Sequence, residues 1–98
     1  MRNRNDYEKA IGVVGAFIRE WDPYSLIEEG APDDEFDAEI AKLVTYIPRI
    51  RFAADAAQAM SEVFSTAFEA ELFSATQCAE PGEALFARLV AAGLVSRP

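Results

Sequence analysis

The amino-acid sequence predicts an all-α protein, a compact single-domain bundle of four main helices plus a short helical turn over residues 1–98. Apolar residues recur at helical spacing along most of the chain, and no segment has the sustained alternation that is typical of a strand. Short joints that contain proline or glycine separate the helical segments. The hydrophobic share of 51% in 98 residues suits one domain with a buried core.

The first helix is expected from about residue 6 to residue 20, with Asp6 at its N-cap. Gly12 and Gly15 interrupt it and lower its helix propensity by roughly 1 kcal/mol each relative to alanine. They either permit a neighbouring helix to approach closely or are tolerated weak points, and both readings stay open. The apolar stripe that should face the core has helical spacing: Tyr7, Ile11, Val14, Phe17, Ile18 and Trp21.

A corner rich in proline, glycine and carboxylates follows, from residue 21 to residue 37. We expect Trp21 to end the first helix and to anchor the corner. Asp22 and Pro23 indicate a new helical start, because proline fits the first position of a helix. A short helical turn would then end at Gly30, since glycine accepts the left-handed backbone angles that stop a helix.

The next helix is expected from Pro32 to Tyr46 or Ile47. The carboxylates after Pro32 face the positive end of the helix dipole, and Pro48 would break or kink the helix at its other end. Its apolar stripe should consist of five residues: Phe36, Ile40, Leu43, Val44 and Ile47.

A connector with two arginines, Arg49 and Arg51, leads to a long helix over residues 53–68. Two arginines are too few for a nucleic-acid patch, so we expect them to pair with the acidic start of a neighbouring helix. Alanines in the long helix favour both helix formation and tight packing. Its inward residues are expected to be Ala56, Met60, Val63, Phe64, Ala67 and Phe68.

A turn over residues 69–73 should carry Leu72 and Phe73 into the core. Ser74 and Gln77 then have the spacing of a capping box, which is typical of a helix start. We therefore expect the last helix to begin at Ser74.

The last helix contains Pro81-Gly82, which would kink it or restart it. Gly93 and Leu94 would close it, as a glycine stop followed by a hydrophobic contact. Four apolar residues between these points should face the core: Leu85, Phe86, Leu89 and Val90.

The charge of the chain argues against two classes of partner. It has 17 acidic and 9 basic residues, for a formal net charge of −8. Nucleic-acid binding needs clustered cations that displace counterions from phosphates, and docking on an anionic membrane needs basic residues as well. We therefore expect no nucleic-acid partner and no membrane partner, whereas a basic protein is the partner that the charge favours.

Histidine-based chemistry is not available to this chain, which has no histidine and one cysteine. We expect Cys78 to be a small buried hydrophobe rather than a nucleophile, although a helix N-terminus would lower its pKa. We expect no cofactor and no enzymatic activity. No apolar run approaches the ~20 residues of a membrane span and no signal-like segment follows the N-terminus, which favours a cytoplasmic bacterial protein.

The acidic cluster in the corner is the first candidate site: Asp33, Asp34, Glu35, Asp37 and Glu39. Carboxylates suit a divalent cation or acid–base catalysis, but the spacing lacks the glycine and terminal glutamate of a calcium loop. Dipole compensation and capping explain most of these residues, so we assign no catalytic residue and no metal ligand. Together with Tyr24, an aromatic residue in the same corner, they form an expected protein-contact surface.

The corner also resembles a known family. Trp21-Asp22-Pro23-Tyr24, followed by Gly30-Ala31-Pro32 and Asp33-Asp34-Glu35-Phe36-Asp37-Ala38-Glu39-Ile40, is similar to a bacterial family of small helical proteins. That family is catalogued as a domain of unknown function first described from bacilli, and Phe36 stands here where its pattern has tyrosine. The resemblance implies an all-helical single domain from about residue 14 to residue 94, and it brings no established activity and no catalytic residue.

Three functional hypotheses follow from the sequence. The first is a non-enzymatic protein-binding module, such as an immunity-type or antitoxin-like inhibitor that covers a basic surface of another protein. The second is a structural or accessory protein that self-associates as a homo-oligomer, through the glycine-bearing first helix or the alanine-rich helix over residues 53–68. The third is a carboxylate-based metal-binding protein or enzyme that uses the acidic cluster.

Overall fold

The computed structural model describes residues 4–22, 30, 36–68 and 73–95. The helical elements in these ranges are α1 (Arg4–Trp21), α2 (Asp37–Tyr46), the 3-10 turn η2 (Ile47–Arg49), α3 (Ala53–Ala67) and α4 (Ala79–Ala91). No strand occurs in the described ranges, so the predicted all-α fold is confirmed. None of the helices described there has the length and apolarity that a membrane crossing requires.

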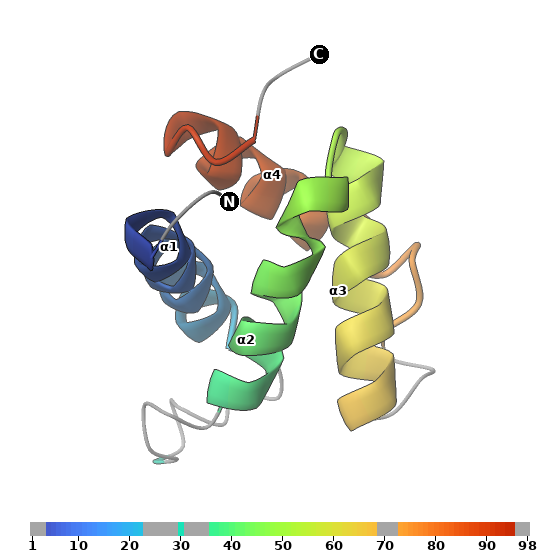
Figure 1. Cartoon of the computed structure of the whole chain (residues 1–98). Coiled ribbons are helices and arrows are strands. Elements are labelled where there is room, and N and C mark those ends of the chain that lie inside the picture. The colour runs from blue at the N-terminus through green and yellow to red at the C-terminus, as the bar shows by residue number, and fades with distance from the viewer. Residues whose placement is uncertain (1–3, 23–29, 31–35, 69–72, 96–98) are drawn as a thin grey trace.

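The four helices contact one another in a ring. As Figure 1 shows, α2 packs against α1 and α3, and α4 closes the ring by packing against α3 and α1. The chain reverses direction at η2, so α2 and α3 lie side by side and antiparallel. α2 ends at Tyr46 as predicted, because Pro48 falls in the following 3-10 turn.

The core is formed by the apolar stripes that helical spacing predicts, with two exceptions among the described residues. Tyr7 is 45% exposed, because the first buried residue of α1 is Ala10 and the turns before it extend past the core. Ala67 is exposed at the end of α3, where Phe68 packs against the core instead. The largest fully buried side chains are Val14, Ile18, Phe36, Ile40, Leu43, Val44, Met60, Phe64, Cys78, Leu85 and Leu89.

Aromatic rings join the ends of the helices around Phe64. The ring of Trp21 meets it edge-on with 5.1 Å between centroids, and the ring of Phe73 lies 5.5 Å away. Phe36, at the start of α2, lies 6.4 Å from Phe64. Trp21 therefore anchors the end of α1 and Phe73 plugs the core, as predicted, whereas Leu72 lies outside the described residues.

A close helix crossing involves Gly82 of α4 and not Gly12 of α1. A Cβ atom at Gly82 would lie 2.5 Å from the Cα atom of Ala57 in α3, so the backbones meet where only glycine fits. A Cβ atom at Gly12 would have no heavy atom within 4 Å. One at Gly15 would lie 3.7 Å from the Ile40 side chain of α2, an ordinary contact. Gly12 is therefore a tolerated weak point.

The predicted capping box is present before α4, but the helix starts later in the chain than predicted. The Gln77 N–H donates to Ser74 Oγ and the Ser74 N–H donates to Gln77 Oε1, each at 3.2 Å. These bonds open a turn over residues 75–78, and the α-helix itself begins at Ala79 rather than at Ser74. Pro81 lies in the first turn of α4, where helical N–H groups have no partner, so it neither kinks nor restarts the helix.

The other end of α4 closes as predicted. The Leu94 N–H donates to the Leu89 carbonyl at 2.9 Å and the Gly93 N–H donates to the Val90 carbonyl at 3.0 Å. Gly93 has a φ of 76°, the left-handed conformation that this stop requires. Leu94 then packs against the core.

The corner is described only at its two sides. Asp22 ends α1: it has a φ of 44°, and its N–H donates to the Ile18 carbonyl at 2.8 Å. Gly30 has the predicted positive φ, at 108°. α2 begins at Asp37, after its N-cap residue Phe36. The expected helical turn after residue 22 and the expected helix start at residues 32–35 lie outside the described residues.

Candidate functional site

The structure does not bring together the acidic residues that it describes in the predicted contact surface. Asp37 is exposed, and its Oδ1 atom lies 3.3 Å from Arg19 Nη2 in α1, whereas Glu39 is only 8% exposed. Residues two positions apart in a helix face different directions, which explains this separation. The remaining members of the predicted surface lie outside the described residues: Tyr24, Asp33, Asp34 and Glu35.

The described side chains include no group of three or more residues that could jointly hold a metal ion. Cys78 is 1% exposed at the N-cap of α4, so the prediction of a buried hydrophobe is confirmed. Burial raises the pKa of its thiol, which opposes formation of a thiolate.

One hollow lies between the end of α1 and the start of α4, and we call it the α1–α4 hollow. It has a volume of about 440 Å³ and is lined by Phe17, Glu20, Trp21, Glu80, Pro81 and Ala84. Aromatic rings from α1 therefore lie beside carboxylates from both helices. The sequence led us to expect an aromatic residue beside carboxylates around Tyr24, which lies outside the described residues; in this hollow the same combination is formed by residues far apart in the chain.

One carboxylate of the α1–α4 hollow is held by an arginine and the other is not. The Arg88 guanidinium donates to both oxygens of Glu20, at 2.7 and 2.8 Å, and lies 5.2 Å from the ring centroid of Phe17. These bonds hold the pKa of the Glu20 carboxyl below its ordinary value and raise that of Arg88, so both groups stay ionised. Glu80 is exposed and forms no ion pair with any residue that the structure describes.

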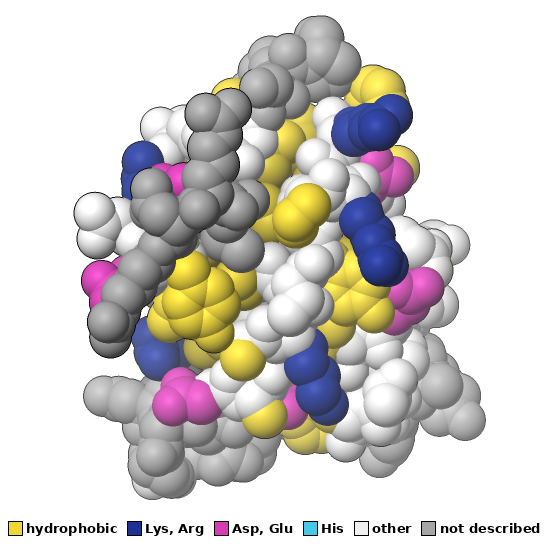
Figure 2. Space-filling model, in the orientation of Figure 1, with side chains coloured by type: hydrophobic (Ala, Val, Ile, Leu, Met, Phe, Trp, Pro, Cys, Tyr) yellow, Lys and Arg dark blue, Asp and Glu magenta, His cyan; other side chains and the backbone are white. Residues whose placement is uncertain are grey.

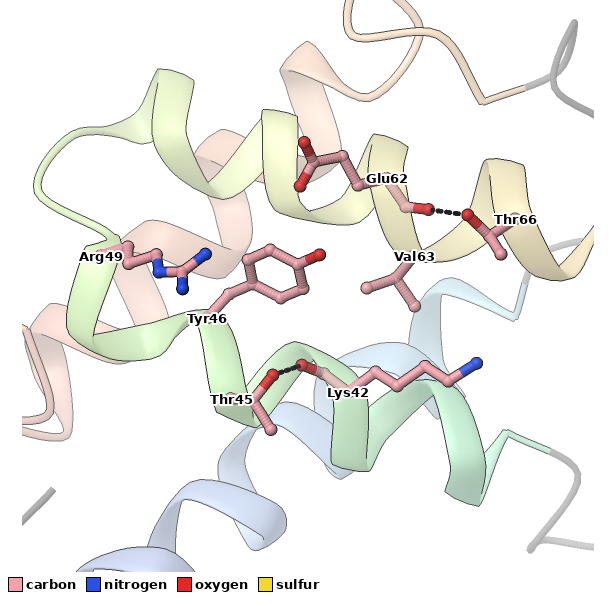
Figure 3. A pocket seen from close by; sticks show the side chains of 7 residues that line it. All are labelled: Lys42, Thr45, Tyr46, Arg49, Glu62, Val63 and Thr66. Atoms are coloured by element: carbon pink, nitrogen blue, oxygen red, sulfur yellow. Dashed lines mark hydrogen bonds between the residues drawn. The ribbon is translucent and has the colours of Figure 1, made fainter.

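The second hollow lies between α2 and α3, and we call it the α2–α3 groove. It has a volume of about 420 Å³ and is lined by Lys42, Thr45, Tyr46, Arg49, Glu62, Val63 and Thr66 (Figure 3). A further hollow of about 220 Å³ continues it past Tyr46, Arg49 and Glu62, toward Ile50, Asp55, Gln58 and Ala59. The groove follows from the antiparallel packing of two helices whose facing residues are about twenty positions apart.

The two walls of the α2–α3 groove differ in charge. α2 and η2 contribute Lys42 and Arg49, with the Arg49 guanidinium 6.0 Å from the Tyr46 ring centroid, and α3 contributes Glu62. Dark blue basic side chains run along the line between the two helices in Figure 2, with magenta carboxylates beside them. The hydroxyls of Thr45 and Thr66 donate to carbonyls of their own helices, at 2.6 and 2.8 Å.

The acidic helix start at residues 33–35 lies outside the described residues, so the pairing of the connector arginines with it stays a prediction. The backbone N–H of Arg51 donates to the carboxylate of Asp55 at 2.9 Å, and this bond helps to start α3. Neither Arg49 nor Arg51 forms an ion pair with a described residue. The spacing of Lys42, Tyr46 and Arg49 could have indicated one helix face, but only the packing of α3 turns that face into a groove.

A family model described as Domain of unknown function (DUF1871) matches residues 13–91 of this chain. This match confirms the resemblance to a domain of unknown function. The searches of curated proteins and of solved structures found no match.

Proposed function

Since the chain belongs to this family of domains of unknown function, we propose its function from its own surfaces: it is a non-enzymatic module that binds a basic protein. The observation that carries the proposal is the α1–α4 hollow, where Phe17 and Trp21 lie beside the carboxylate of Glu80, which no described residue pairs with. We take this hollow as the centre of the proposed contact surface.

The α1–α4 hollow suits a lysine or arginine side chain of a partner. The aliphatic stem of such a side chain packs on aromatic rings while its charged end remains near carboxylates. Glu80 supplies the carboxylate, because Glu20 is already bound to Arg88. The net charge of −8 adds a long-range attraction that steers a basic surface toward the protein.

An inhibitor of the immunity or antitoxin kind would use this surface to cover a basic site on its target. In sequence, the acidic corner begins directly after Trp21, so Tyr24, Asp33, Asp34 and Glu35 would enlarge the contact around the hollow. Such an inhibitor needs no chemistry of its own, because covering the target is sufficient.

Affinity capture from a native lysate tests this proposal. The immobilised protein should retain a basic protein at low salt and release it at high salt, because screening weakens contacts between charged surfaces. Glu80→Lys should abolish the capture, since it places a cation where the partner's cation binds. Glu62→Lys is the matched control, because it changes the net charge equally at an exposed position of the other hollow, and it should leave the capture intact.

Two results would contradict the proposal. One is the absence of any salt-sensitive basic partner in the lysate. The other is equal loss of capture in Glu80→Lys and Glu62→Lys, which would mean that net charge and not the α1–α4 hollow determines binding.

A further inference from the structure

We propose that a second copy of this chain docks on the α2–α3 groove, so that α2 of each copy lies over α3 of the other. This contact is separate from the proposed binding of a basic protein, because the α2–α3 groove and the α1–α4 hollow share no lining residue among those described. A protein paired in this way keeps both of its α1–α4 hollows accessible.

The charges of the groove walls are the first argument. Lys42 and Arg49 lie on the α2 side, Glu62 lies on the α3 side, and none of the three forms an ion pair with a described residue. Arg19 and Arg88, by contrast, are each paired with a carboxylate inside the molecule. The groove therefore presents charges of both signs that no described residue neutralises.

In a symmetric pair, the basic wall of each copy can face the acidic wall of the other copy. In a two-fold contact the same surface is used by both copies, so that when residue i meets residue j, residue j also meets residue i. A two-fold axis that runs along the groove places the α2 wall of each copy over the α3 wall of the other. Arg49 then meets Glu62 of the second copy, and Glu62 meets Arg49 of the second copy.

The apolar part of the surface is the second argument. The ring of Tyr46 reaches from α2 toward α3 and lies near Val63 in the floor of the groove, as Figure 3 shows. Aromatic groups with polar surroundings are typical of the centres of protein interfaces.

A partner with charge of a single sign suits this groove less well than a second copy. An acidic segment would meet Glu62 and Asp55, and a basic segment would meet Lys42 and Arg49. The repulsion between two copies of net charge −8 is a long-range effect, and salt at physiological strength screens charges more than about 8 Å apart. The facing walls would be closer than that distance.

Sedimentation at physiological salt over a series of protein concentrations tests the pairing. The wild type should convert from monomer to dimer as its concentration rises. Arg49→Glu places a carboxylate opposite Glu62 of the second copy, and Glu62→Arg places a guanidinium opposite Arg49 of the second copy. Each single variant should weaken the dimer about tenfold or more, since like charges then face each other twice. Both positions are exposed, and circular dichroism should show unchanged helix content.

The two variants together give the sharper result. A mixture of the Arg49→Glu and Glu62→Arg proteins should form a heterodimer, because opposite charges then meet at both contacts between positions 49 and 62. A chain that carries both substitutions should dimerise again for the same reason. Lys9→Glu is the matched control for Arg49→Glu, since it makes the same change in net charge at an exposed position of α1. It should leave the dimer intact. A wild type that stays monomeric, single variants that dimerise as tightly as the wild type, or a mixture that does not associate would overturn the proposal.

Discussion

At the scale of single residues, the structure assigns different roles to the glycines of the chain. Gly82 sits where the backbones of α3 and α4 meet, whereas Gly12 faces open space. Both lie inside segments with helical spacing of apolar residues, so the helical pattern does not separate them. The difference depends on which residue of another helix lies opposite, and that is a property of the tertiary packing.

This difference predicts opposite effects of the same substitution. Gly82→Ala would force a Cβ atom to 2.5 Å from the Ala57 Cα, so we expect it to lower the free energy of unfolding by about 2 kcal/mol or more. Gly12→Ala removes a flexible residue from a helix interior without a clash, and should raise the free energy of unfolding by about 0.5 to 1 kcal/mol. Urea denaturation of both variants checks this, and a Gly82→Ala protein as stable as the wild type would contradict the close crossing.

At the scale of elements, the residue types near a helix end were sufficient to predict where that helix stops. Gly93 stops α4, and Pro48 follows directly after the end of α2, as their residue types predict. The exposure of Tyr7 and Ala67 was not predictable in this way, because both fit the helical stripe but lie in the terminal turns of their helices. Periodicity identifies the inner face of a helix without showing how far along its length that face is covered.

The capping box before α4 gives a prediction at this scale. Ser74→Ala removes the oxygen that accepts the Gln77 N–H, so the free energy of unfolding should fall by about 1 kcal/mol. Thr76→Ala alters an exposed side chain in the same turn and should change that free energy by less than about 0.5 kcal/mol. Thermal or urea unfolding measures both, and equal effects would mean that the box adds nothing beyond the turn itself.

At the scale of the whole molecule, both hollows arise between helices that are distant in sequence. The residues of the α1–α4 hollow are about sixty positions apart, and those of the α2–α3 groove about twenty. Composition predicted an acidic protein, but it could not show that Glu80 would lie beside Phe17 and Trp21. The sequence led us to expect a contact surface in the corner between α1 and α2, whereas the α1–α4 hollow depends on packing between helices that composition does not encode.

The central claim is that the α1–α4 hollow binds a basic protein, and site-specific photo-cross-linking tests it most directly. A photoreactive phenylalanine analogue is placed at Ala84, an exposed residue that lines the hollow, or at Ala54, an exposed residue of α3 that lines neither hollow. In native lysate at low salt, the probe at position 84 should form a cross-linked product with a basic protein. This product should disappear at high salt or when Glu80→Lys is added, and the probe at position 54 should not form it. No product from position 84, or the same product from position 54, would contradict the claim.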